Sequence, residues 1–70
     1  MNLNELEVGV EKIIKEVKCD DSELNSFLFS LGCYSGQPIT VVRHLKGGPI
    51  VAIKYGRYNI DKNLAKAIIV

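Results

Sequence analysis

The chain has 70 residues, 47% of them hydrophobic and 24% charged, and its formal net charge at pH 7 is +1. This length predicts one domain over residues 1–70 with a small core, because so short a chain buries only about 60% of the surface that its unfolded form exposes. The nine basic residues do not collect on one stretch of the chain, which also carries eight acidic residues, and this argues against a protein that binds nucleic acid through clustered positive charge. The longest apolar runs are far shorter than the roughly 20 residues of a membrane-spanning helix.

The N-terminal part predicts one irregular segment and one strand. Apolar Leu3 and Leu6 dock the irregular segment, and the glycine that follows ends it. Over residues 10–19, apolar and polar side chains alternate as in a strand with one buried face. On this pattern, the face that carries Ile13 is mostly buried and the face that carries Ile14 is mostly solvated.

A short helix is predicted over Ser22–Leu31. The Asp-Asp-Ser-Glu sequence at its start supplies a capping side chain and places acidic groups at the positive end of the helix dipole. Gly32 and Gly36 follow the helix and give the chain the backbone freedom for a corner between helix and sheet. The apolar residues of the helix recur at helical spacing and are expected to cover one open end of a small barrel: Leu24, Phe27, Leu28 and Leu31.

The second half of the chain predicts a β-meander. Strands are expected over residues 39–45, 50–55 and 58–60, where β-branched residues are frequent. Gly48 lies in the turn between the first two strands, and Gly56 with Arg57 forms a tight link to the third. Residues 61–66 predict one helical turn, and residues 67–70 predict a last strand that pairs with the first and closes the barrel.

Together these elements predict a mainly β fold with a short helix. The expected architecture is a small SH3-like β-barrel of about five strands, with one inserted helix and a helical turn before the last strand. Two cysteines and an N-terminus without a signal-peptide pattern indicate a reducing compartment, the cytoplasm.

The side chains that could ligate a metal or catalyse a reaction are few and widely spaced. Cys19, Cys33 and His44 form no close-spaced pair, so no metal site and no cofactor are expected, and the two cysteines are expected to be reduced and to serve packing. No nucleophile and base can be assembled around the single histidine. The Gly-Gly-Pro sequence leads into a strand, whereas a phosphate loop leads into a helix. The sequence therefore predicts a protein that is not an enzyme.

The segment Tyr55-Gly56-Arg57-Tyr58 is the predicted partner-binding site. Tyrosine and arginine are enriched among the residues that contribute most to binding energy, and three of them stand here on one short link. The alternative is that each tyrosine ring closes an end of the barrel while its hydroxyl reaches water. The residues leave both interpretations open.

A combination of motifs extends over nearly the whole chain, from Leu3 to Val70. Its parts are Phe27-Leu28-x-x-Leu31-Gly32-Cys33-x-x-Gly36, then Gly48-Pro49-Ile50, then Gly56, and finally Ala65-x-x-Ile68-x-Val70. Each part is weak alone, but the combination resembles the FeoA family, ferrous iron transport protein A. The resemblance implies a small cytoplasmic SH3-like domain that works with the membrane permease for ferrous iron, whose cytoplasmic part contains a GTP-binding domain.

The sequence is compatible with two functions of different classes. The resemblance implies a non-enzymatic regulatory protein that docks on the cytoplasmic part of a FeoB-type permease. The alternative is a nucleic-acid-binding barrel, against which the even distribution of charge counts. Asn59-Ile60-Asp61 stands where family members commonly carry Ala-Leu-Arg, which either changes docking or only alters a solvated strand end. Weak self-association through an unpaired strand edge or the apolar helix face is also open.

Overall fold

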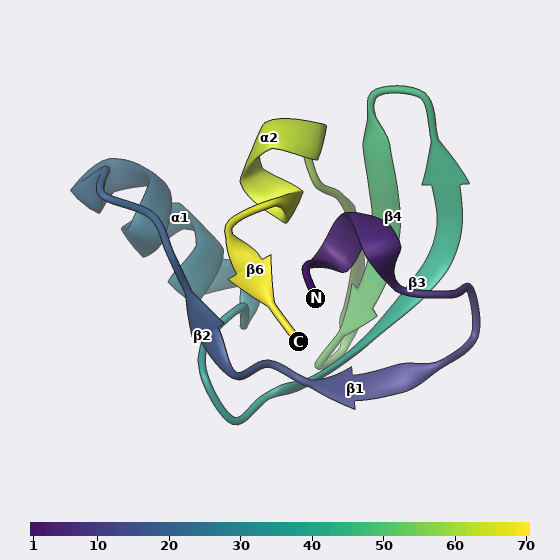
Figure 1. Ribbon diagram of the computed structural model, residues 1–70. Helices are drawn as coiled ribbons and strands as arrows, with labels where there is room; N and C mark the ends of the chain where they lie inside the picture. Colours follow the sequence, from purple (N-terminus) through teal and green to yellow (C-terminus); the bar gives the residue numbers. More distant parts are fainter.

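The computed structural model describes all 70 residues and contains nine short elements (Figure 1). The strands are β1 (Glu11–Ile13), β2 (Glu16–Val17), β3 (Pro38–Leu45), β4 (Gly48–Ile53), β5 (Gly56–Asn59) and β6 (Ile68–Ile69). The helical elements are the 3-10 turn η1 (Leu3–Glu5), α1 (Ser22–Leu31) and α2 (Lys62–Ala65). No helix among them has the length and apolar character needed to cross a membrane.

The strands form two antiparallel sheets. One sheet has four strands in the order β1-β3-β4-β5, and the other pairs β2 with β6. The mainly β architecture, the inserted helix and the helical turn before the last strand are confirmed, and the last strand pairs with the N-terminal segment as predicted. The structure differs from the prediction in having six strands, and its two sheets do not join into a closed barrel.

The two ends of the chain lie side by side (Figure 1). The Val70 amide donates to the Met1 carbonyl at 2.9 Å, and Asn2 forms an isolated antiparallel bridge with Ile69. The first and last residues are thereby tied to each other and to the two-stranded sheet.

The predicted first strand is wrong in one respect, because it consists of two strands that belong to different sheets. The break falls at Ile14 and Lys15. Their consecutive amides donate to the Gln37 carbonyl at 2.9 Å and to the Ile69 carbonyl at 2.7 Å, on opposite sides of the chain. This change of partner reverses the alternation of side chains. Ile14 is therefore buried and Ile13 is 52% exposed, the opposite of the predicted faces.

Helix α1 has the predicted bounds. The Asp21 carboxylate accepts the amides of Glu23 and Leu24 at 2.9 and 3.2 Å, which satisfies donors that have no partner within the helix. Gly32 ends the helix with a φ of 100°, and Gly36, with a φ of 92°, turns the chain toward β3. Both are left-handed conformations that glycine adopts at no steric cost, so the corner predicted from these two glycines is present.

The apolar stripe of α1 covers less of the core than predicted. Leu28 is fully buried and Leu31 is half-buried, whereas Leu24 and Phe27 are 38% and 52% exposed. The two sheets do not form a closed barrel with an open end for this stripe to cover. The helix therefore meets the core along one edge and leaves apolar surface exposed.

The core consists of 13 buried hydrophobic residues, and no polar or charged residue is buried. The inner face of the four-stranded sheet contributes Ile39 and Val41 from β3 and Val51 and Ile53 from β4. Since successive residues of a strand point to opposite faces, the residues between them lie on the outer face of the sheet.

Gly48 allows two segments of backbone to touch beside the turn between β3 and β4. Lys46 and Gly47 form this turn, and Gly48 begins β4 with a φ of 139°. A Cβ atom on Gly48 would overlap the carbonyl oxygen of Ile60 and lie 2.7 Å from the amide nitrogen of Lys62. The Lys62 amide donates to the Gly47 carbonyl at 2.9 Å. Only glycine fits at this position.

Candidate functional site

The predicted site residues lie on and beside the turn that joins β4 to β5. Ile53 pairs with Gly56, so Lys54 and Tyr55 form the turn. The predicted link at Gly56 and Arg57 is wrong, because both residues belong to β5. Lys54 has a φ of 52° and is the only residue other than glycine with a positive φ. A lysine thus takes the left-handed conformation that glycine or asparagine most often takes in hairpin turns.

Contacts with the segment after α1 support Lys54 in this conformation. Its side-chain stem packs on Gly32, where an added Cβ atom would lie 3.1 Å from the Lys54 Cδ. Its Nζ lies 5.1 Å from the ring centre of Tyr34, a cation–π contact. The Tyr34 ring lies 4.8 Å from the ring of Phe29 on α1. The β4–β5 turn is therefore supported by the C-terminal end of α1.

The structure separates the three residues that were predicted to bind a partner. Tyr55 is fully exposed at the tip of the turn. Arg57 is exposed on the outer face of the sheet, opposite Ala52. Tyr58 is half-buried on the inner face, where its ring packs against the core and over Gly56. Tyr55 and Arg57 thus lie at one accessible surface, whereas Tyr58 has the packing role that the sequence left open.

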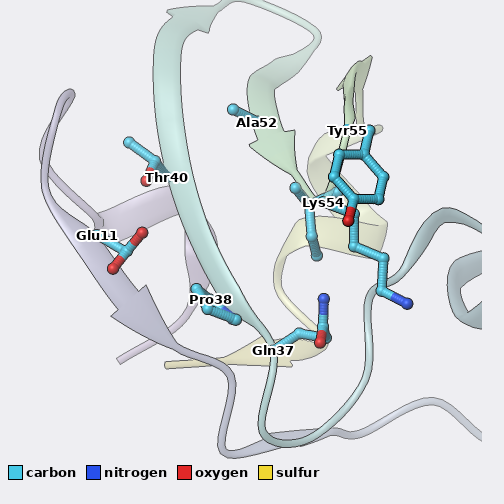
Figure 2. Close-up of a pocket in the computed structure, with 8 residues that line it drawn as sticks. Glu11, Gln37, Pro38, Thr40, Ala52, Lys54 and Tyr55 are labelled. Atoms are coloured by element: carbon cyan, nitrogen blue, oxygen red, sulfur yellow. The ribbon is translucent and has the colours of Figure 1, made fainter.

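A shallow cleft lies on the outer face of the four-stranded sheet, next to Tyr55 (Figure 2). It has a volume of about 490 Å³, and the side chains of Thr40 and Ala52 lie between Glu11 on one side and Tyr55 on the other. A second hollow of about 430 Å³ shares Ala52, Lys54 and Tyr55 with the first and is also lined by Arg57. Together the two hollows extend from β1 to β5.

Of the residues that line this cleft, only Tyr55 was assigned to a site from sequence, and Glu11, Thr40 and Ala52 are among those that were missed. The alternation along the two central strands already gives Thr40 and Ala52 the parity opposite to the buried residues, which was the available signal. No local pattern sets Glu11 beside Thr40, because that pairing joins segments almost 30 residues apart.

A family model described as the FeoA domain matches residues 1–70. The chain belongs to the FeoA family. Its structure is similar to the solution structure of iron(II) transport protein A from Clostridium thermocellum, with a TM-score of 0.88 and 26% identity over 97% of the chain. The chain spans 43% of the length of that protein. No protein of curated function matches the sequence.

Two crystal structures of FeoA proteins are also similar to the chain. An iron uptake regulatory protein, FeoA, is 25% identical with a TM-score of 0.85, over 97% of this chain and 91% of that one. The zinc complex of Stenotrophomonas maltophilia FeoA, described as a prokaryotic SH3 domain protein, is 20% identical with a TM-score of 0.85, over 100% and 88% of the two chains. The predicted SH3-like fold is confirmed, and the FeoA family links the chain to ferrous iron transport.

The side chains of this FeoA domain that could ligate a metal lie in different surroundings. Cys33 is 2% exposed in the core, where burial raises the pKa of its thiol to about 11. Cys19 is half-buried, with its thiol 3.7 Å from the Asp21 carbonyl. The His44 Nε2 donates to the Leu6 carbonyl at 2.7 Å. No three His, Cys, Asp or Glu side chains converge, and both thiols are free.

Proposed function

We propose that the protein is a non-enzymatic cytoplasmic accessory factor of ferrous iron uptake that docks on the cytoplasmic part of a FeoB-type permease. Membership of the FeoA family supports the link to iron transport. A structural relative from Stenotrophomonas maltophilia is described as a candidate ferrous iron transport activating factor. The docking surface in this proposal consists of Tyr55, Arg57 and the cleft beside them.

The full exposure of Tyr55 on a supported turn carries the proposal. A tyrosine provides a large contact area and has few rotatable bonds, so it loses little conformational entropy on binding. The contacts of Lys54 with Gly32 and Tyr34 restrict the turn before any partner arrives. A preorganised surface of this kind binds with a smaller entropic cost.

Docking of this kind regulates a partner by differential affinity. A domain that binds one conformation of the permease more tightly than another shifts the equilibrium toward the first. This mechanism requires no chemical step of the domain itself.

Calorimetric titration with the purified cytoplasmic part of the permease tests the proposal. The unmodified protein is expected to bind, Tyr55→Ala is expected to lower the affinity about tenfold, or about 1.4 kcal/mol, and Arg57→Ala is expected to lower it about threefold. The matched control is Lys66→Ala, which removes an exposed cation at the end of α2. No binding by the unmodified protein, or equal affinities for all three variants, would contradict the proposal.

The same preparation tests the nucleic-acid alternative. Gel-shift assays with single-stranded and duplex probes are expected to show no retarded complex, because the formal net charge of the chain is only +1. A retarded complex that weakens with added salt would favour the nucleic-acid-binding barrel.

A further inference from the structure

One row of residues on the outer sheet face carries opposite charges at its two ends. It crosses all four strands, because Glu11 pairs with Thr40, Thr40 pairs with Ala52, and Ala52 pairs with Arg57. The two middle side chains are short, and the two end side chains are long and charged. The row therefore forms a trough with a carboxylate at one end and a guanidinium at the other.

Neither charged end of the row has a partner within the protein. The single ion pair of the structure joins Lys18 and Glu16. Neither the Glu11 carboxylate nor the Arg57 guanidinium takes part in a side-chain hydrogen bond. Both residues are exposed, so both charges are available to another molecule.

The trough has room for a polypeptide segment. The hollows on either side of Tyr55 have volumes of about 490 and 430 Å³ and together extend over the whole row. Figure 2 shows the Glu11 carboxylate on the Thr40 side of the cleft and the Tyr55 ring on the opposite side. A main chain can pass over Thr40 and Ala52 while the exposed ring provides an apolar wall.

We infer that this row binds an extended peptide segment whose basic side chain pairs with Glu11 and whose acidic side chain pairs with Arg57. Three strand spacings of about 4.8 Å separate the ends of the row by about 14 Å. An extended chain rises about 3.3 Å per residue, so the two charged residues of the segment lie four or five positions apart. The inference rests on the proposed docking function and specifies the chemistry of the partner at the same site.

The charged ends act mainly on selectivity. Exposed ion pairs contribute little affinity individually, but an unmatched or repelled charge disfavours the wrong partner. Arg57 adds geometric specificity, since a guanidinium can hold a carboxylate by two parallel hydrogen bonds. The contact area of Tyr55 and the trough supplies the remainder of the binding energy.

Synthetic peptides measure the required spacing directly. Capped peptides with one arginine and one glutamate, separated by zero to six serine or threonine residues, are titrated into 15N-labelled protein. Amide shifts are expected at Glu11, Thr40, Ala52, Tyr55 and Arg57. The affinity is expected to be at least about fivefold higher at a spacing of four or five positions than for adjacent charges. Equal affinity at every spacing, no shift with any peptide, or shifts confined to other surfaces would overturn the inference.

A charge reversal at Glu11 tests whether this residue sets the preference of the row for a basic side chain in the peptide. Glu11→Lys makes both ends of the row positive, so the variant is expected to prefer a peptide with two glutamates at the best spacing over the arginine–glutamate peptide. The unmodified protein is expected to show the reverse preference, by about fivefold. The matched control Glu7→Lys reverses an exposed acid outside the row and should retain the original preference. Retention of that preference by Glu11→Lys would count against the row.

Three further outcomes separate the inference from the docking proposal. Permease binding that is weakened by Tyr55→Ala but not by Glu11→Lys would support docking and overturn the charged row. Peptide binding that follows the spacing rule without any permease binding would support the row and overturn docking on the permease. Concentration-dependent shifts of the same amides without peptide would assign the row to a second copy of the chain and overturn the inference.

Discussion

The two turns at the ends of β4 have the same length and opposite surroundings. At the first, Gly48 lies against the backbone of residues 60–62, and the Lys62 amide donates to the Gly47 carbonyl at 2.9 Å. At the second, a side chain, Lys54, provides the support and Tyr55 is fully exposed. A turn held by backbone contact tolerates little change, whereas a turn held by a side chain leaves its neighbour free to meet a partner.

The largest effect is expected at the first turn. Gly48→Ala places a Cβ atom against the backbone of residues 60–62 and forces a left-handed φ on alanine, so the free energy of unfolding should fall by about 3 kcal/mol. Urea denaturation measures this loss. The control Gly47→Ala adds a methyl group with no atom within 4 Å and should change stability by less than about 0.5 kcal/mol. Similar losses of stability in the two variants would show that backbone contact at Gly48 does not make it less tolerant of substitution than Gly47.

The segment that supports the second turn contains a buried group that titrates, the thiol of Cys33. Cys33 follows Gly32, and burial raises the pKa of its thiol from 9.0 to about 11. The unfolded chain then releases this proton at a lower pH than the folded chain. The contribution of the protonated thiol to the free energy of unfolding is therefore fully present below pH 9. It is lost as the pH rises to 11, which lowers the free energy of unfolding by roughly 2 to 3 kcal/mol.

Urea denaturation of the unmodified protein and Cys33→Ala from pH 7 to pH 11 checks this expectation. The variant lacks the buried thiol of Cys33 and both proteins keep Cys19, so the difference between their free energies of unfolding should shrink above pH 9. A difference that stays constant with pH would show that Cys33 is not shielded from water.

The two tyrosines on either side of Gly56 are expected to separate stability from binding. Tyr58→Ala should lower the free energy of unfolding by about 2 kcal/mol, because its ring is half-buried against the core. Tyr55→Ala should change stability by less than about 0.5 kcal/mol, since the side chain is fully exposed. Thermal unfolding measures both, and Tyr58→Phe, which keeps the ring, should bind the permease normally. A large loss of stability in Tyr55→Ala would mean that Tyr55, like Tyr58, contributes to the folding of the domain.

The smallest effect is expected at Tyr34. Tyr34→Leu keeps apolar bulk but removes the cation–π contact with Lys54 and the ring contact with Phe29, which should cost about 0.5 to 1 kcal/mol. The proton shifts of the Lys54 side chain measure the loss of the ring directly. Tyr55→Leu is the matched control and should leave those shifts unchanged. Unaltered Lys54 shifts in Tyr34→Leu would show that another contact supports the turn.

The helix and its two ends were predictable because their signals are local. Asp21 caps the first turn, and the positive φ of Gly32 ends the last, so a short window of sequence contains the information. The pairing of the last strand with the N-terminal segment was also predictable, since a β-branched run at a chain end requires a partner. The family resemblance rested on the same local motifs.

The errors came from contacts between distant segments. Ile14 is buried because its strand changes sheets, and nothing near Ile14 in the sequence encodes that change. Lys54 adopts a conformation usual for glycine, and the residues that support it, Tyr34 and Gly32, precede it by 20 and 22 positions in the sequence. The charged row depends on a register across four strands, so the sequence reveals its residues but not their alignment.

The adjacent chain ends have a consequence for how this fold is combined with others. Because the Met1 carbonyl accepts the Val70 amide, both ends leave the domain at one point. A unit of this kind can be inserted into a surface loop of a host protein without forcing the loop open, and a short linker suffices to permute it circularly. In the Clostridium thermocellum protein, the matched unit occupies 43% of a longer chain. The geometry of the ends suits this SH3-like domain to use as a module within larger proteins.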